Sequence, residues 1–215
     1  MRAYIYTGGA IDPANITDHP KGDDLLIAAD SGFDNAAALG EKPSILVGDL
    51  DSINLDSIKG KKIPDGVEIY KVPAEKDLTD TQLAVELALS KGARDIVIIG
   101  GLSGRLDHTL SNLGILEHLA DLGCHGVITD GFNRARFLRN GSTLIPRGAY
   151  TYLSLLAADK VVKGIEIDGV KYPLKKAKLC RDHQYAVSNE LTGNCAFIAV
   201  KKGGLYIIES KDGAR

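Results

Sequence analysis

The chain has 215 residues, of which 44% are hydrophobic and 25% charged, a composition that excludes a disordered or fibrous protein. Its 26 basic and 28 acidic side chains give a formal net charge of −2, so it lacks the basic excess that a nucleic-acid partner would require. Apolar runs are far shorter than the ~20 residues of a membrane span, and the N-terminal one is too short for a signal peptide. We therefore expect a cytoplasmic protein with neither nucleic acid nor membrane as a partner.

The first ~130 residues alternate short apolar runs with helical patterns, which is typical of β–α–β units around a parallel sheet. Strands are predicted at Ala3–Tyr6, Leu25–Ala29, Ile45–Val47, Glu68–Val72, Ile96–Ile99 and Val127–Thr129. Helices are predicted at Phe33–Leu39, Asp80–Lys91 and His108–Leu122. Each helix is followed by a glycine that can end it, namely Gly40, Gly92 and Gly123.

After about Gly141 the pattern changes to short strands separated by turn residues. Asp168-Gly169 predicts a hairpin within Ile165–Leu174, because Asp-Gly between β-prone arms favours a tight turn. Further β-structure is predicted as a hairpin over Phe197–Ile208 and as strands at Tyr150–Leu156 and Tyr185–Glu190. We expect an α/β domain over residues 1–140, with a mostly parallel sheet flanked by helices, followed by a smaller antiparallel β-sandwich over residues 141–215.

Polar residues gather just after the predicted parallel strands, at the sheet edge where α/β proteins bind ligands. Asp30 and Ser31 follow the second strand, although Ser31 could instead cap the next helix with Asp34 three residues on. Asp49 and Asp51 follow the third strand and project to the same side of an extended chain. Two such carboxylates repel unless a cation or an arginine lies between them, which favours a magnesium site.

A third cluster surrounds the start of the second long helix. Thr79 and Gln82 have the spacing of a capping box, which by itself would explain Thr79 structurally. Lys76, Asp77 and Asp80 crowd the same helix start, where exposed N–H groups favour phosphate. Asp80 can add a third carboxylate to the cation.

A fourth cluster is the glycine-rich segment 100–112. Its glycines allow backbone to approach a bulky ligand, and the planar fork of Arg105 suits phosphate oxygens. His108 and Asn112, four residues apart, share a helix face, whereas Asp107 could be no more than a helix cap. Carboxylates, a phosphate-accepting helix start and an arginine, without a P-loop motif, indicate magnesium-assisted phosphate chemistry.

These residues form an ordered set that resembles the thiamine pyrophosphokinase family. The set comprises D-S-G from Asp30, G-D-x-D-S from Gly48, K-D-x-T-D from Lys76, G-G-x-x-G-R-x-D-H-x-x-x-N from Gly100, and the late pair Ser188-Asn189. The resemblance implies a homodimeric transferase that moves the terminal diphosphate of ATP to the hydroxyl of thiamine and releases AMP. It also implies an α/β domain followed by a β-sandwich.

The resemblance assigns roles motif by motif. It implies Mg²⁺ held by Asp49, Asp51 and Asp80, and a diphosphate faced by Lys76. The nucleotide and its phosphates would be held by Asp30, Thr79, Arg105 and Asp107, and thiamine by Ser188 and Asn189. Some family members place a tryptophan against thiamine, but this chain has none, and Tyr206 is a candidate for a comparable position.

Two other interpretations compete with this one. Asp49 and Asp51 after a strand resemble the nucleophile loop of haloacid-dehalogenase-like phosphatases, in which Asp49 would be phosphorylated. That loop usually lies near the N-terminus, whereas here two predicted strands precede it. The chain could also be a thiamine or nucleotide sensor without turnover, although the three acidic residues favour catalysis.

Overall fold

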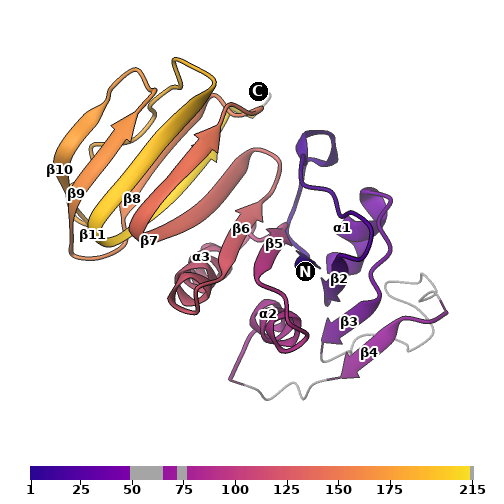
Figure 1. The fold of residues 1–215 in the computed structure, drawn as a ribbon. Helices are drawn as coiled ribbons and strands as arrows, with labels where there is room; N and C mark the ends of the chain where they lie inside the picture. Colours follow the sequence, from indigo (N-terminus) through magenta and orange to yellow (C-terminus); the bar gives the residue numbers. More distant parts are fainter. Residues whose placement is uncertain (49–64, 72–76, 214–215) are drawn as a thin grey trace. The chain divides into compact units, whose positions relative to one another are not determined.

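The computed structural model describes residues 1–48, 65–71 and 77–213, and the chain divides into two compact units (Figure 1). The first consists of Met1–Ile115 and Gly123–Gly131, and we call it the α/β unit. The second consists of Leu116–Leu122 and Phe132–Arg215, and we call it the β unit. The expected boundary between residues 140 and 141 falls within a strand of the β unit, Asn133–Pro146.

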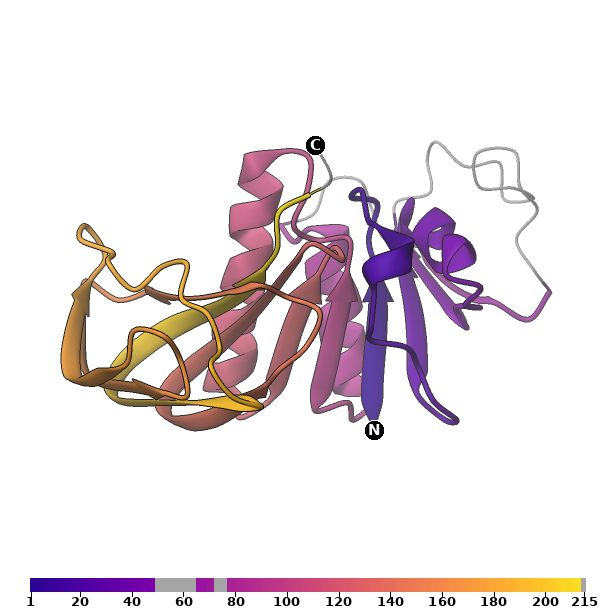
Figure 2. The same ribbon diagram turned by 90° about the horizontal axis from the view of Figure 1, so that it is seen from above.

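The α/β unit contains a parallel sheet, in which the described strands run in the order β6-β5-β1-β2-β3-β4. The strands are β1 Arg2–Tyr6, β2 Leu25–Ala29, β3 Ile45–Gly48, β4 Glu68–Lys71, β5 Asp95–Ile99 and β6 His125–Thr129. Figure 2 shows the strands from above, side by side. The six predicted strands are confirmed, except that Val72 lies outside the described residues.

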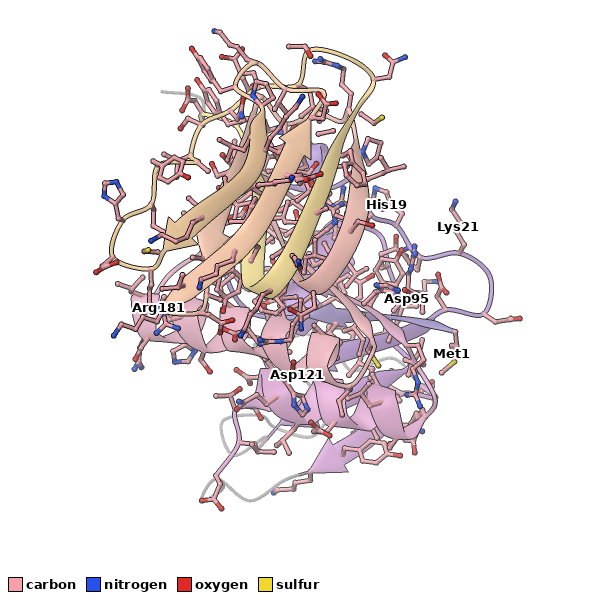
Figure 3. The ribbon with its side chains drawn as sticks, turned by 60° about the vertical axis from the view of Figure 1, so that its left-hand side comes forward. Met1, His19, Lys21, Asp95, Asp121 and Arg181 are labelled. Atoms are coloured by element: carbon pink, nitrogen blue, oxygen red, sulfur yellow. The ribbon has the colours of Figure 1, made fainter. Side chains whose placement is uncertain are left out.

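Parallel pairing sets which ends of the strands meet. Arg2 pairs with Asp95 and Tyr6 with Ile99, so β1 and β5 run in register, and Figure 3 shows Met1 and Asp95 near the same edge of the sheet. Tyr4 and Tyr6 lie on one face of β1 and belong to a buried cluster, whose other members are Ile16, Ala36, Val97 and Ile99. The carboxyl ends of the strands therefore meet at the opposite edge, where the candidate ligands of the sequence analysis follow.

The described chain contains three helices, α1 Gly32–Ala38, α2 Asp80–Ser90 and α3 Leu106–Asp121, of which α3 from Leu116 onwards belongs to the β unit. A short 3₁₀ turn, η1, spans Pro13–Asn15. The three helix predictions are confirmed. The glycines expected to end them, Gly40, Gly92 and Gly123, have φ angles of 74°, 89° and 69°, a conformation that glycine adopts without steric cost.

The β unit is built from antiparallel strands around one long central strand. Its strands are β7 Asn133–Pro146, β8 Tyr152–Ala157, β9 Val161–Asp168, β10 Leu174–Cys180 and β11 Cys195–Ser210. β11 pairs with β7 along one edge, and with β9 and then β8 along the other. β8 and β10 also contact each other, which closes the strands around a core of alternating buried residues such as Leu153, Leu155 and Ala157. The expected fold class is confirmed.

Details of the β unit differ from the sequence-based expectations. The hairpin over Phe197–Ile208 is wrong, because β11 continues through it with a bulge between Val200 and Gly204. Both halves keep pairing with β7, so the glycines bend the strand instead of reversing it. Tyr185–Glu190 is not a strand; Asn189 makes an isolated bridge with Leu153. The hairpin of β9 and β10 is confirmed, although Asp168-Gly169 begins a longer loop that ends at Leu174.

No helix in the described part of the chain is both long enough and apolar enough to cross a membrane.

Candidate active site

A pocket of about 320 Å³ lies in the α/β unit at the carboxyl ends of β1, β2 and β5. It is also bordered by the first turns of α2 and α3. Its lining includes Thr7, Gly8, Gly9, Asp30, Ser31, Thr79, Asp80, Gly100, Ser103, Gly104, Arg105, His108 and Asn112. Tertiary structure therefore brings together Asp30, Thr79, Asp80 and Arg105, which were predicted from three separate motifs. This is the sheet edge at which open α/β folds bind ligands.

Close backbone contacts form the floor of the pocket. A Cβ atom on Gly8 would lie 2.0 Å from the Ser31 hydroxyl oxygen, and one on Gly9 would lie 1.9 Å from the carbonyl oxygen of Gly100. The segments after β1, β2 and β5 can approach this closely only because glycine occupies these positions. Sequence reasoning did not identify Gly8 and Gly9 as site residues. The signal was present, because a Gly-Gly pair lies one residue after a predicted strand.

Asp30 has a left-handed backbone conformation, with φ of 47°. Its N–H donates a hydrogen bond to the carbonyl oxygen of Val47 at 2.8 Å, so it is held immediately beyond the paired part of β2. Non-glycine residues adopt this conformation at some energetic cost, and aspartate tolerates it better than most. Ser31 occupies the N-cap position of α1, but its side chain makes no capping hydrogen bond, so the alternative interpretation of Ser31 as a side-chain cap is wrong.

The start of α2 is fixed by the predicted capping box, which is confirmed. The N–H of Gln82 donates to the Thr79 hydroxyl at 3.2 Å, and the N–H of Thr79 donates to the Gln82 side chain at 2.9 Å. Asp80 is the first residue of the helix and lines the pocket. The positive end of the helix dipole therefore faces the same space as the Asp80 position, which suits a phosphate accompanied by a cation.

Arg105 and Asp107 form a bidentate ion pair at the start of α3. The Nε and Nη2 groups of Arg105 donate to the two carboxylate oxygens of Asp107 at 3.1 and 2.5 Å. The hydrogen bond from Arg105 holds the pKa of Asp107 at about 2, below its ordinary value, and the N–H of His108 also donates to this carboxylate. Because α3 begins at Leu106, Asp107 lies inside the first turn and is not the cap.

Asn112 is buried one turn beyond His108, and both residues line the pocket, as their spacing predicts. The Asn112 amide donates to the carbonyl oxygen of Gly101 at 2.9 Å. It thereby ties α3 to the glycine-rich segment that follows β5. His108 is exposed at the pocket.

The predicted thiamine ligands Ser188 and Asn189 lie in the β unit. Asn189 is buried; its amide donates to the carbonyl oxygen of Tyr172 at 2.8 Å, and its side-chain oxygen accepts from the N–H groups of Tyr172 and Glu190 at 3.0 Å. Asn189 therefore fixes the loop between β9 and β10. Ser188 is exposed and has φ of 55°, and its N–H donates to the Ser154 hydroxyl at 2.9 Å.

Tyr206 packs against other side chains of the β unit. Its hydroxyl donates to Glu117, and its ring and that of Phe137 are T-shaped, with centroids 5.2 Å apart. Burial raises the pKa of the Tyr206 hydroxyl, and the hydrogen bond to Glu117 raises it further. These contacts give Tyr206 a structural role within the β unit.

Three predicted site residues, Asp49, Asp51 and Lys76, lie outside the described residues. Within the described ranges, no group of three or more His, Cys, Asp or Glu side chains is placed to hold a metal ion. Of the three predicted metal ligands, the described one, Asp80, lines the pocket. Asp30 contributes a second carboxylate to the same pocket.

Comparison with known proteins gives two family matches that together span most of the chain. The profile "Thiamin pyrophosphokinase, catalytic domain" matches residues 18–128, and "Thiamin pyrophosphokinase, vitamin B1 binding domain" matches residues 142–205. The chain belongs to the thiamine pyrophosphokinase family. The catalytic profile covers most of the pocket, while the vitamin B1 profile covers Ser188 and Asn189.

Individual relatives agree with the family assignment. A thiamine pyrophosphokinase of Bacillus subtilis is 30% identical over 197 residues, which cover 87% of this chain and 88% of the relative. The crystal structure of the Bacillus subtilis thiamine pyrophosphokinase has a TM-score of 0.85 at 25% identity and covers 99% of this chain and 100% of that one. A thiamin pyrophosphokinase from Geobacillus thermodenitrificans has a TM-score of 0.85 at 28% identity, with 100% and 99% of the two chains covered.

Membership of the thiamine pyrophosphokinase family bears on the two competing interpretations. Neither a phosphatase of the haloacid-dehalogenase type nor a non-catalytic sensor is supported by these matches. The matches also extend through both units, so the β unit is as much a part of the family fold as the α/β unit.

Proposed function

We propose that this chain is a thiamine diphosphokinase, which transfers the diphosphate of ATP to the hydroxyl of thiamine and gives thiamine diphosphate and AMP. The observation that carries the proposal is the pocket at the strand ends, which combines acidic side chains with the N-terminal turns of two helices. Helix N-termini and an arginine suit the phosphates of a nucleotide, and carboxylates suit the cation that accompanies them.

In this proposal, several pocket residues and Asp107 bind different parts of the nucleotide. Asp30, Thr79, Arg105 and Asp107 hold ATP in this proposal, with Arg105 on the phosphates. Thr79 acts largely through its cap on α2, and Asp107 acts through the orientation of Arg105. Lys76 faces the diphosphate and offsets its charge together with Arg105.

In the reaction, the hydroxyl oxygen of thiamine forms a bond to the β-phosphorus of ATP. The bond between that phosphorus and the oxygen leading to the α-phosphorus breaks, and AMP departs with the electron pair. Phosphoryl transfer through a loose transition state makes little demand on a general base, so a pocket carboxylate suffices to accept the hydroxyl proton. Arg105 stabilises the charge on the phosphoryl oxygens.

We further propose that the enzyme is magnesium-dependent, with Asp49, Asp51 and Asp80 as ligands. The described residues fit this ion, because Asp80 and Asp30 present hard oxygen donors at one pocket beside a phosphate-accepting helix start. When bound, Mg²⁺ would offset the negative charge of the diphosphate. Asp80→Asn keeps the shape of the side chain and removes its charge, so we expect kcat to fall by at least ~10²-fold, with folding intact.

Thiamine is assigned to the β unit, through Ser188 and Asn189. The support is the vitamin B1 profile over residues 142–205. In addition, Ser188 is exposed and has a left-handed backbone conformation, which is uncommon for serine. Asn189 contributes by holding the loop that contains Tyr172. In the proposal, the α/β unit is the catalytic domain, and the β unit binds thiamine and dimerises. We also propose a homodimer, and a cytoplasmic location because the donor is ATP.

The deciding experiment is analysis of the nucleotides after incubation with ATP, Mg²⁺ and thiamine. Formation of AMP that requires thiamine, together with thiamine diphosphate in equal amount, supports diphosphate transfer. ADP in place of AMP would identify a monophosphate kinase, and no product would contradict the proposed activity. Asp80→Asn serves as the matched control, since it separates turnover at this site from a contaminating activity.

A further inference from the structure

The turn that follows β1 forms one wall of the pocket through Thr7, Gly8 and Gly9. None of these residues belongs to a motif of the sequence analysis, and residues 7–9 precede the range that the catalytic profile matches. The turn is nevertheless tied firmly to elements that come later in the chain. The inference that follows rests on the proposed function, because it concerns how that pocket holds the phosphates of its nucleotide.

Two side chains bind the carbonyl groups of this turn. The Asn35 amide, on α1, donates to the carbonyl oxygen of Thr7 at 2.6 Å and to that of Gly9 at 2.7 Å. The Ser103 hydroxyl donates to the carbonyl oxygen of Ala10 at 2.9 Å. Three of the four carbonyls between Thr7 and Ala10 are therefore fixed by side chains from distant parts of the sequence.

Fixing these carbonyls also fixes the N–H groups. In a trans peptide, the C=O of one residue and the N–H of the next point in opposite directions, and the described chain has no cis peptide bond. The N–H groups of Gly8 and Ala10 therefore point away from the Asn35 amide. In the described part of the chain they have no hydrogen-bond acceptor, and both residues are exposed. Exposed backbone N–H groups without an acceptor favour an anion, and Gly8 lines the pocket while Ala10 follows it in the same turn.

We propose that Asn35 is a positioning residue, which directs the carbonyls of Thr7 and Gly9 away from the pocket so that the turn offers N–H groups to a phosphate of the nucleotide. Without the amide, these carbonyl oxygens would lose their donors, and the peptides could rotate to place oxygen atoms against the phosphate. Glycine at positions 8 and 9 lets the turn pack against the segments after β2 and β5, because a side chain at either would strike backbone or Ser31.

The test is a titration of ¹⁵N-labelled protein with inorganic pyrophosphate, followed through the amide signals of Gly8 and Ala10. In the unmodified chain, both signals should shift and saturate. Asn35→Ala should weaken binding by about tenfold while unfolding stays cooperative, and Ser103→Ala should weaken it less. Ser44→Ala is the matched control, because it also removes a bond from a hydroxyl to a carbonyl, that of Leu26, away from the pocket. It should bind as the unmodified chain does.

Unresponsive Gly8 and Ala10 signals in the unmodified chain would overturn the proposal. So would unchanged affinity in both Asn35→Ala and Ser103→Ala. If Asn35→Ala does not fold, the titration is repeated with Asn35→Ser, which shortens the donor, and the result is judged together with Ser103→Ala, which removes a donor at the same turn. A pyrophosphate titration that behaves as expected in a chain that makes no AMP would contradict the proposed function alone.

Discussion

The guanidinium of Arg105 donates two hydrogen bonds to Asp107, and its side chain is 75% exposed. Exposed ion pairs contribute little to stability, because water screens the charges and the side chains lose entropy when they pair. The Arg105–Asp107 pair therefore matters for the orientation of the guanidinium and not for stability. Asp107 holds a planar fork in place at the pocket, and a phosphate can compete for the same N–H groups.

Arg105→Lys tests this assignment. Lysine keeps the charge but lacks the fork, so we expect the KM for ATP to rise by about tenfold, with the melting temperature within about 2 °C of the unmodified chain. Steady-state kinetics and a thermal melt check both parts. A collapse of the melting temperature with normal kinetics in the folded fraction would instead identify Arg105 as a structural residue.

The pKa of Asp107 gives a second prediction at the scale of a residue. The folded-state pKa is about 2 and the ordinary value is 3.8, so pairing with Arg105 is complete above about pH 4 and is lost as pH falls through the lower value. Asp107 should therefore stay mostly ionised at pH 3, and its pKa should rise in Arg105→Gln, which removes the largest cause of the lowering. The carboxyl carbon shift of Asp107 measures this. Identical titration in both chains would contradict the pairing.

At the scale of secondary-structure elements, the bulge in β11 shows how a strand is bent without being ended. Gly203 has φ of 105°, and its N–H donates to the side chain of Asn140 at 2.9 Å. The N–H of Gly204 donates to Asp159, also at 2.9 Å. These bonds satisfy the backbone groups that the bulge removes from pairing with β7. β11 can then pair with β9 before the bulge and with β8 after it.

Gly203→Ala should destabilise the β unit by about 1–3 kcal/mol, because alanine is strained at this φ angle and its Cβ would lie 2.9 Å from Asp159 Oδ2. Gly193→Ala is the matched control. Gly193 lies in a loop of the same unit, with no atom within 4 Å of an added Cβ, so its variant should stay within about 0.5 kcal/mol of the unmodified chain. Urea unfolding measures the free energy of each variant. Equal stability of the two would contradict the role of the bulge.

At the scale of the whole molecule, Asp80 and Ser188 belong to different compact units of the chain. Suppose that the proposed homodimer completes each active site with residues of both chains. Asp80→Asn then damages the part of a site that one chain supplies, and Ser188→Ala damages the part that the other chain supplies. Each variant alone should be nearly inactive. In a mixed dimer, both lesions fall in one site and the other site is intact, so co-refolding equal amounts should restore about a quarter of the unmodified activity by random pairing.

The measurement is the activity of the co-refolded mixture against the mean of the two variants, with exchange of subunits verified independently. Sites that are complete within one chain would give no restoration. That outcome would contradict the shared-site dimer while leaving the diphosphokinase activity intact.

Sequence alone predicted the features that depend on neighbouring residues. Apolar runs predicted the parallel strands, and glycines predicted the helix ends, where the structure gives them positive φ. Thr79 with Gln82 predicted a capping box that the structure confirms. These are local properties, decided within one or two turns of chain. The clusters after the strands could also be predicted to converge, because parallel strands bring their carboxyl ends to one edge.

Tertiary structure decided everything that required a distant partner. Phe197–Ile208 has the local pattern of a hairpin, but pairing with β7 on both sides of the bulge between Val200 and Gly204 made it one strand. Gly8 and Gly9 belong to the pocket because Ser31 and Gly100, remote in sequence, pack against them. Asn35 acquires its role in the same way. The physical reason is common to all three: a hydrogen bond or a close packing contact depends on the position of both partners, and the sequence near one of them does not contain the other.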